Sequence, residues 1–276
     1  MSSKKHTRKI NKEIIIGGAI LSLYILWAFG WLMTNGGSYI PESIISHELF
    51  SPFSHDYILG TDINGRSLFK VLSVGLIYTV GISLLISISS CVIGIVIGYL
   101  SAIRIKFISE IMDMLTNLIF IFPSILLAIL VMSFSGQSFS GLVLCLIFTS
   151  WPGYARIARG ETMRVLNLGY VESARAIGVG EFRLFYKSIL PSIIPVISIH
   201  FVLGISGVII SEASLGFLGL GASEYSWGAI LAMAKLVLLE APHVVIVTSL
   251  LMTGLIISLN LFSDGLRDYL DPKLKN

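Results

Sequence analysis

The stretch RIARGETMRVLNLGYVESARAIGVGEFRLFYK, residues 156–187, holds six Lys or Arg and three Glu, and uncharged apolar runs lie on both sides of it. Of the 276 residues, 55% are hydrophobic and 13% are charged, whereas soluble domains carry about 25% charged residues. This composition is typical of an integral membrane protein. The charged island 156–187 is therefore expected to lie in water, between segments that cross the membrane.

Six apolar segments are long enough to cross a hydrocarbon core of about 30 Å, which takes about 20 helical residues. They are 14–34, 71–103, the two halves of the uncharged block 114–155, 188–211 and 241–263. The block 114–155 divides near 133–140, where Ser135-Gly136-Gln137-Ser138 predicts a turn. Segment 71–103 exceeds one crossing, so we expect it to tilt or protrude. We predict an all-α integral membrane protein with six transmembrane helices, and an interfacial or re-entrant segment at 225–239.

The orientation follows from the Lys and Arg residues in the loops, because cytoplasmic loops carry an excess of them. With the N-terminus inside, sixteen of the 19 Lys and Arg lie on the inner side, and Arg66, Lys70 and Lys235 lie outside. Both termini are therefore expected to be cytoplasmic. The formal charge of +3 reflects this topology and gives no reason to expect a nucleic-acid partner.

The first apolar segment is predicted to be a retained anchor, because it exceeds the apolar region of a signal peptide and no A-x-A-like cleavage site follows it. The expected organisation is a cytoplasmic tail 1–13, the anchor 14–34, an extracytoplasmic loop 35–70, a core 71–265 with five transmembrane helices and the charged loop 157–190, and a cytoplasmic tail 266–276.

The chain shows no motif for chemistry of its own. It has no P-loop, no H-E-x-x-H and no nucleophile elbow. Cys91 and Cys145 both fall within spans and are interpreted as core-packing residues. We expect no catalytic residue, no metal site and no cofactor bound by this chain.

Two spans carry small residues at helix-packing spacing, namely Gly94-x-x-x-Gly98 and, after Gly204, Gly207-x-x-x-Ser211. Such spacing lets helix backbones approach closely in lipid. Two interpretations remain open: ordinary packing within this chain, or a pairing face toward a second membrane subunit or a mobile seam. In the third span, Pro123 is able to kink the helix.

Two ionisable residues of the fifth apolar segment are candidates for a translocation pathway. Glu212 lies at the expected outer end of the span, where it is either a boundary residue or a pathway residue. His200 lies within the span, where two roles are open: a packed, hydrogen-bonded side chain or a ligand.

The charged island resolves into short helices. Residues 163–168 lead to Gly169, residues 170–177 form an amphipathic helix that Gly178 ends, and residues 181–188 return to the membrane. Glu172 lies in the first turn, where the helix dipole favours a carboxylate. A solvated basic loop explains the arginines of this island, but it does not explain two helices separated by glycine.

Here the sequence resembles a known family. Glu172-Ser173-Ala174-x-x-x-Gly178, followed by Leu190-Pro191, is similar to the EAA loop of ABC-importer membrane subunits, with Ser173 and Ser188 as mild departures. Further matches identify the peptide/nickel permease family, C-type subunit, over about 57–274: LGTDINGR (59–66), FPSILLAI (122–129), WPGYAR (151–156), RGE (159–161), FLGLG (217–221), WG (227–228) and DGLRDYLDP (264–272). Two departures are Ser67, where the family usually has Asp, and 222–226, which replaces a Pro-containing stretch.

The resemblance implies a type I ABC-importer permease fold in a prokaryotic cell membrane. Its implied partners are a second, different permease subunit, two ABC ATPase subunits that hold ATP and Mg, and an extracytoplasmic binding protein. The implied ATPase-coupling residues are Glu172, Ser173, Ala174, Ala176, Gly178, Leu190 and Pro191. The implied structural positions are Asp62, Gly65, Arg66, Pro123, Trp151, Gly153, Gly219 and Gly221.

The cargo that the resemblance implies is an oligopeptide or dipeptide, and nickel or a metal chelate is the alternative. The competing hypothesis is a protein of a different class, namely an ATPase-independent channel or secondary transporter. Such a protein would place more charges deep in its spans, whereas this chain concentrates them in the loop.

Overall fold

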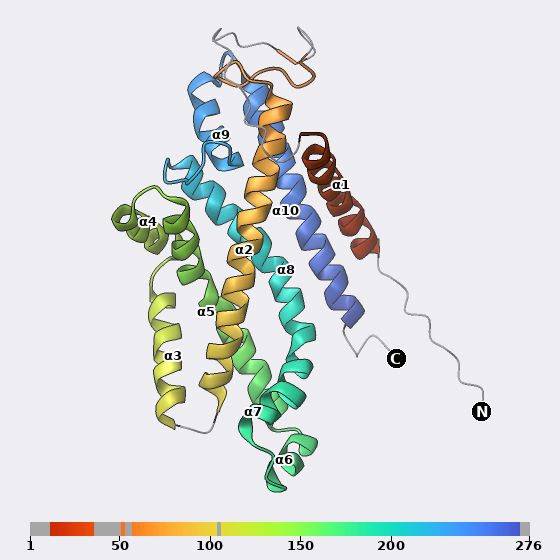
Figure 1. Ribbon diagram of the computed structural model, residues 1–276, viewed down its shortest axis with the longest axis vertical. Coiled ribbons are helices and arrows are strands. Elements are labelled where there is room, and N and C mark those ends of the chain that lie inside the picture. The colour runs from red at the N-terminus through yellow and green to blue at the C-terminus, as the bar shows by residue number, and fades with distance from the viewer. Residues whose placement is uncertain (1–11, 36–50, 53–56, 104–105, 271–276) are drawn as a thin grey trace, which may run out of the picture.

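The computed structural model describes residues 12–35, 51–52, 57–103 and 106–270. The elements are α1 (Lys12–Asn35), α2 (Leu68–Ala102), α3 (Lys106–Ile121), α4 (Ser124–Ser135), α5 (Phe139–Leu166), α6 (Gly169–Ala176), α7 (Glu181–Leu184), a π-helical turn η1 (Phe185–Ile189), α8 (Leu190–Phe217), α9 (Trp227–Ala234), a 3₁₀ turn η2 (Lys235–Val237) and α10 (Pro242–Leu270). Figure 1 shows α2, α5 and α8 along the long axis of the molecule, with α6 at one end and α9 at the other.

The centre of the bundle is the close pairing of α2 with α5. A Cβ on Gly94 would lie 2.4 Å from the Tyr154 Cβ, and one on Gly98 would lie 2.5 Å from the Ala155 carbonyl oxygen. The two glycines therefore pack within this chain, which is the first of the two interpretations of their spacing. Gly207 differs, because it is exposed and no atom lies within 4 Å of its Cβ position.

The third predicted span is broken rather than kinked. α3 and α4 are separated by Phe122-Pro123 and meet at an angle of 91°. Proline has no backbone N–H and its ring clashes with the preceding helical turn, so the helix ends before it and restarts at Ser124. The described residues thus hold five helices that could each cross a membrane, or six spans if the bent pair is one.

Both helices that flank the charged island are longer than predicted. α5 continues through Arg156 and ends at Leu166, so the prediction of a separate helical stretch at 163–168 is wrong. α7, η1 and α8 are continuous, so residues 181–188 are not a separate helix either. The Leu190 N–H bonds to the Phe185 carbonyl, a π-type turn that directly precedes Pro191, where an ordinary helix would force a steric clash.

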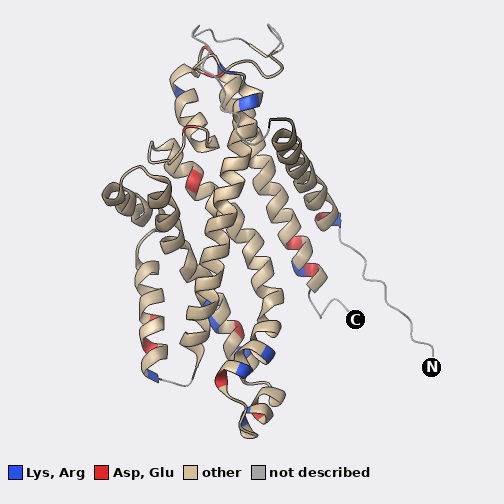
Figure 2. Cartoon of the chain, viewed as in Figure 1, with Lys and Arg blue, Asp and Glu red and all other residues tan. Residues whose placement is uncertain are grey.

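α1 packs beside α10 through two glycines. A Cβ on Gly17 would lie 2.5 Å from the Phe262 nitrogen, and one on Gly265 would lie 2.5 Å from the Ile14 nitrogen. The two helices are therefore antiparallel, and the start of α1 lies beside the end of α10 (Figure 1). Charged residues gather toward the α6 end and are sparse along the middle of the bundle (Figure 2).

Candidate functional site

The helix α6 presents most of its surface to solvent. We call residues 169–189 the α6 tip. Val171 is wholly buried and belongs to the same apolar cluster as Leu184 and Ile189. Glu172 and Ala176 are exposed, as is Ser173, while Ala174 is half-buried. One apolar side chain thus anchors the helix while its polar and small residues remain available to a partner.

Gly178 ends α6 in a defined geometry. Its φ is +86°, which L-residues with a side chain rarely adopt. The Gly178 N–H bonds to the Arg175 carbonyl (3.0 Å) and the Val179 N–H to the Ala174 carbonyl (3.1 Å). This pair of bonds is a Schellman motif. The predicted stop at Gly178 is therefore a rigid corner between α6 and α7.

Side-chain bonds brace the α6 tip on two sides. The Arg175 Nε and Nη2 donate to the two carboxylate oxygens of Glu181, at 3.1 and 3.2 Å. The hydroxyls of Tyr170 and Ser192 lie 3.1 Å apart, which links α6 to α8. Glu181 is thus engaged within the tip, whereas Glu172 faces solvent.

The structure also shows exposed apolar residues on the α6 tip that the sequence interpretation did not single out. Ile177 is 82% exposed, Phe182 is 83% exposed and Tyr186 is 64% exposed. Apolar residues grouped at an exposed tip mark an interaction surface. A sequence signal for them exists, because they are large apolar side chains next to the charged residues of the island. Leu190 is half-buried, and Pro191 is exposed beside η1.

The WPGYAR motif connects α5 to α3. The Arg156 guanidinium lies 3.9 Å from the centre of the Phe120 ring, and Arg159 forms an ion pair with Asp113. Asp113 of α3 thus contacts α5. Trp151 is buried, and Gly153 has no atom within 4 Å of its Cβ position.

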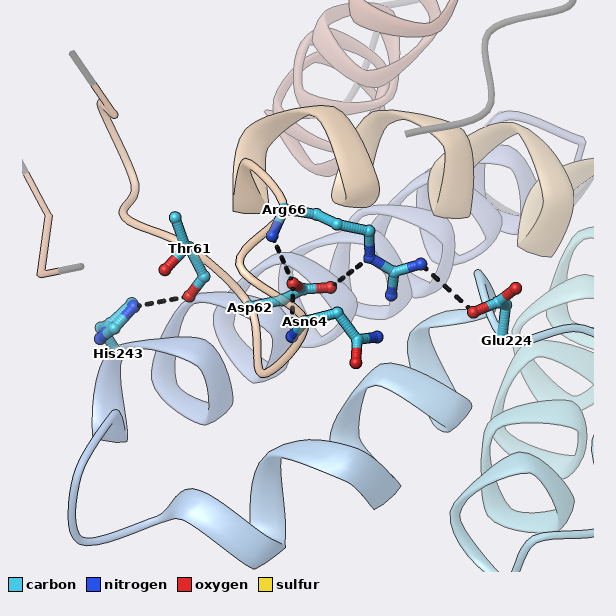
Figure 3. A network of polar contacts seen from close by, with 6 residues as sticks. All are labelled: Thr61, Asp62, Asn64, Arg66, Glu224 and His243. Carbon is cyan, nitrogen blue, oxygen red and sulfur yellow. Dashed lines mark hydrogen bonds and ion pairs between the residues drawn. The ribbon is translucent and has the colours of Figure 1, made fainter. Parts of the chain in front are cut away.

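At the α9 end, the segment before α2 forms a tight turn around Asp62 (Figure 3). One Asp62 carboxylate oxygen accepts from the backbone N–H groups of Asn64 (3.0 Å) and Arg66 (2.8 Å). The other accepts from the Arg66 Nε at 2.7 Å. Gly65 has a φ of +72°, and the His243 Nε2 lies 3.2 Å from the Thr61 carbonyl oxygen. The turn therefore joins α2 to the first turn of α10.

Arg66 extends this turn to the loop between α8 and α9. It is 3% exposed, and its Nη1 donates to Glu224 at 3.2 Å (Figure 3). Burial disfavours the charged guanidinium, but the Asp62 and Glu224 carboxylates outweigh burial and raise the pKa of Arg66. Glu224 belongs to the stretch 222–226, which departs from the pattern of the family that the sequence resembles. The ion pair with Arg66 is therefore made by a residue of this divergent loop.

Gly219 ends α8 in the same way that Gly178 ends α6. Its φ is +79°, and the bonds from Gly219 to Gly216 (3.0 Å) and from Leu220 to Leu215 (2.8 Å) form a second Schellman motif. The Gln137 amide donates to the Gly219 carbonyl at 2.5 Å. Gly221 and Gly216 also border an open cavity of about 390 Å³ beside α9.

The two pathway candidates lie apart on α8. His200 is half-buried and lines a cavity of about 370 Å³ with Asp264 and Arg267 of α10. Glu212 is wholly buried, so it is not an exposed boundary residue. Twelve helical residues separate the two by about 18 Å. Among the described residues, no group of three His, Cys, Asp or Glu could hold a metal ion.

This architecture is that of a multi-pass membrane permease with a solvent-facing helical tip. Residues 94–276 match the family described as binding-protein-dependent transport system inner membrane component. The chain belongs to this family, and it is therefore a permease subunit of an ABC importer.

Named relatives agree with this family. The chain is 36% identical over 220 residues to a glutathione transport system permease protein of Pectobacterium atrosepticum, covering 79% of this chain and 73% of the relative. It is 35% identical over 226 residues to a di/tripeptide transport system permease protein of Pseudomonas aeruginosa, covering 80% and 73%.

Solved structures share the fold. A chain of the inward-facing MetNI methionine ABC transporter has a TM-score of 0.62 at 17% identity, over 72% of this chain and 96% of that one. A chain of an amino acid ABC transporter has a TM-score of 0.55 at 19% identity, over 71% and 91%. At these identities the likeness concerns the fold alone.

Proposed function

We propose that this chain forms half of the translocation pathway of an ATP-driven importer for glutathione or short peptides. The cargo class rests on the relatives, which are glutathione and di/tripeptide permeases. The α6 tip carries the coupling part of the proposal, because it is a braced, exposed helix with one carboxylate left facing solvent. The family supports an importer over a self-sufficient channel or secondary transporter.

The proposed orientation places the α6 end and both termini in the cytoplasm, and the α9 end outside. Two ABC ATPase subunits then bind the α6 tip and hold ATP and Mg. A second, different permease subunit completes the pathway, and a binding protein delivers cargo at the α9 end. The concentration of Lys and Arg in the island 156–187 supports this orientation.

The structure offers a direct mechanical route from the α6 tip into the membrane. α5 runs unbroken from Leu166 at the tip into the core, and the helical segment 181–217 leads back along α8. A displacement of α6 by the ATPases would therefore tilt α5 and α8 together. Packed helices with two alternative arrangements respond to such a bias as a switch.

Replacing Glu172 by alanine should weaken ATPase docking about tenfold and reduce uptake, while membrane insertion stays normal. The reason is the loss of a charge-assisted hydrogen bond, worth about 1.5–3 kcal/mol. The measurement is ATPase affinity together with uptake in proteoliposomes. Glu110→Ala is the matched control, because Glu110 is exposed on α3 with only a 3.8 Å contact to Lys106. Equal docking by both variants would contradict the role of Glu172.

Gly178→Asp should also weaken docking and uptake without loss of insertion. A side chain at the positive φ of Gly178 costs about 1 kcal/mol and distorts the corner that positions α6. Gly180→Asp adds the same charge two residues away, at a φ of −64° before α7, where aspartate is a favourable helix cap. If both variants lose docking equally, added charge rather than geometry is responsible. Affinity for the ATPase subunits distinguishes the two cases.

The cargo is tested by reconstituting the chain with its partner subunits and comparing peptide-loaded with metal-loaded binding protein. Stimulation of ATP hydrolysis by glutathione or dipeptides, but not by nickel or a nickel chelate, is the expected result. If only the metal-loaded binding protein stimulates ATP hydrolysis, the cargo is a metal or metal chelate and not a peptide. Transport by the purified chain without ATPases would overturn the importer mechanism.

A further inference from the structure

The first turn of α9 is wedged between α2 and α8. Trp227 is wholly buried, and its indole N–H donates to the Leu72 carbonyl at 3.1 Å. A Cβ on Gly75 of α2 would lie 2.7 Å from the Trp227 ring, and one on Gly228 would lie 2.4 Å from the Ala213 carbonyl oxygen. Residues 226–229 are therefore packed closely against both α2 and α8.

Glu212 of α8 is buried beside this turn. It is 0% exposed, and neither of its carboxylate oxygens has a hydrogen-bond partner among the described residues. The Ser226 hydroxyl lies beside the carboxyl group and accepts from the Ala229 N–H at 3.2 Å. The carboxyl group thus adjoins the residue that caps α9.

The groups that face Glu212 from its neighbours offer no positive charge. From α2, Tyr78 lies close enough to interact with Glu212, and its hydroxyl is also buried with no hydrogen-bond partner among the described residues. On α5, the buried Cys145 belongs to the same apolar cluster as Leu215 of α8, and its thiol donates to the Ala128 carbonyl. In the part of the chain that the structure describes, no Lys, Arg or His acts on the Glu212 carboxyl.

An ionised carboxylate buried away from water and from any positive charge costs several kcal/mol, whereas the neutral carboxylic acid carries no charge to desolvate. We propose that Glu212 is kept as the neutral acid, and that it positions residues 226–229 against α8 until loss of its proton releases them. The packed turn accommodates the protonated form, so it is favoured at low pH and weakened as pH rises. Glu212 is thus a positioning residue that acts through the first turn of α9.

The consequence for import rests on the orientation proposed above, in which the α9 end faces outward. Release of residues 226–229 would then loosen the outer end of the bundle. The positioning role itself does not depend on cargo or on ATPase coupling, so its failure and the failure of the proposed function are distinguishable.

Hydrogen–deuterium exchange on the full chain in lipid nanodiscs tests the proposal. Wild type and Glu212→Gln are compared at each pH from 4 to 9, so that the intrinsic pH dependence of exchange cancels. We expect amides 228–232 to exchange equally at pH 4, where a carboxyl group is largely protonated even when it is released into water, and at least tenfold faster in wild type at the highest pH. Glu212→Gln, a neutral mimic of the acid, should remain protected throughout.

Two controls make the result decisive. Glu224→Gln removes an exposed carboxylate of the same end and should keep the wild-type pH response. Amides of α5 should not change, because a change there means global unfolding. The proposal is overturned if wild type and Glu212→Gln exchange alike at every pH, if α5 changes with α9, or if Glu212→Gln does not fold.

Discussion

Asp62→Ala should lower the free energy of unfolding by about 3–5 kcal/mol, the cost of leaving one partner of a buried ion pair alone. The Arg66 guanidinium is nearly inaccessible, and its Nη2 already has no partner among the described residues. Without Asp62 its one ion pair among the described residues would be with Glu224, whose side chain is 57% exposed, and its guanidinium would keep the Tyr225 ring at 5.4 Å. The same substitution removes the acceptor for the Asn64 and Arg66 backbone N–H groups.

Unfolding of the purified chain in mixed micelles, followed by circular dichroism, measures this effect. Glu224→Gln is the matched control and should cost at most about 1 kcal/mol, because exposed ion pairs contribute little. The double variant Asp62→Ala with Arg66→Met should recover part of the loss, since no buried charge is then left unpaired. A cost for Asp62→Ala no larger than that for Glu224→Gln would refute the buried pair as the source of stability.

The fold was predictable where local sequence decides it. Uncharged apolar length predicted α2, because hydrocarbon thickness sets helix length. The small and polar residues at 135–138 predicted the turn after α4. The 91° break at Pro123 was not predictable in size, since proline permits a range of bends and packing selects one. The extension of α5 through Arg156 was missed because charges were read as loop residues, whereas contacts with α3 keep them helical.

The candidate site likewise has features that local sequence predicts and features that depend on residues far apart in the chain. Gly178 was predictable as a helix end, because a glycine after an amphipathic helix is a local signal. The contact of Arg66 with Glu224 joins residues 158 positions apart, and no local pattern predicts such a pair. Burial of Glu212 was missed for the same reason, because α9 covers it through contacts that depend on Gly75 and Gly228.

Gly94→Val should cost about 3 kcal/mol of stability, the upper end of the cost of overpacking a core. The new Cβ would lie 2.4 Å from the Tyr154 Cβ and 2.9 Å from the Ala155 nitrogen, and part of this contact is with backbone that cannot rotate away. α2 and α5 would have to separate along the most extensive helix pair of the bundle. Unfolding in mixed micelles and the yield of monodisperse protein report the loss.

Gly207→Val is the matched control, because the same substitution on α8 meets no atom within 4 Å. The isolated chain should therefore keep its stability. Gly207 is exposed and Ser211 is half-buried in this chain, and small residues let two membrane helices approach closely. If the face of α8 that carries these two residues pairs with the second permease subunit, Gly207→Val should reduce co-purification of that subunit about tenfold while stability is unchanged. Normal co-purification of the second subunit with Gly207→Val would indicate that this face contacts lipid and not that subunit. A Gly94→Val variant as stable as wild type would show that the close approach of α2 and α5 does not contribute to stability.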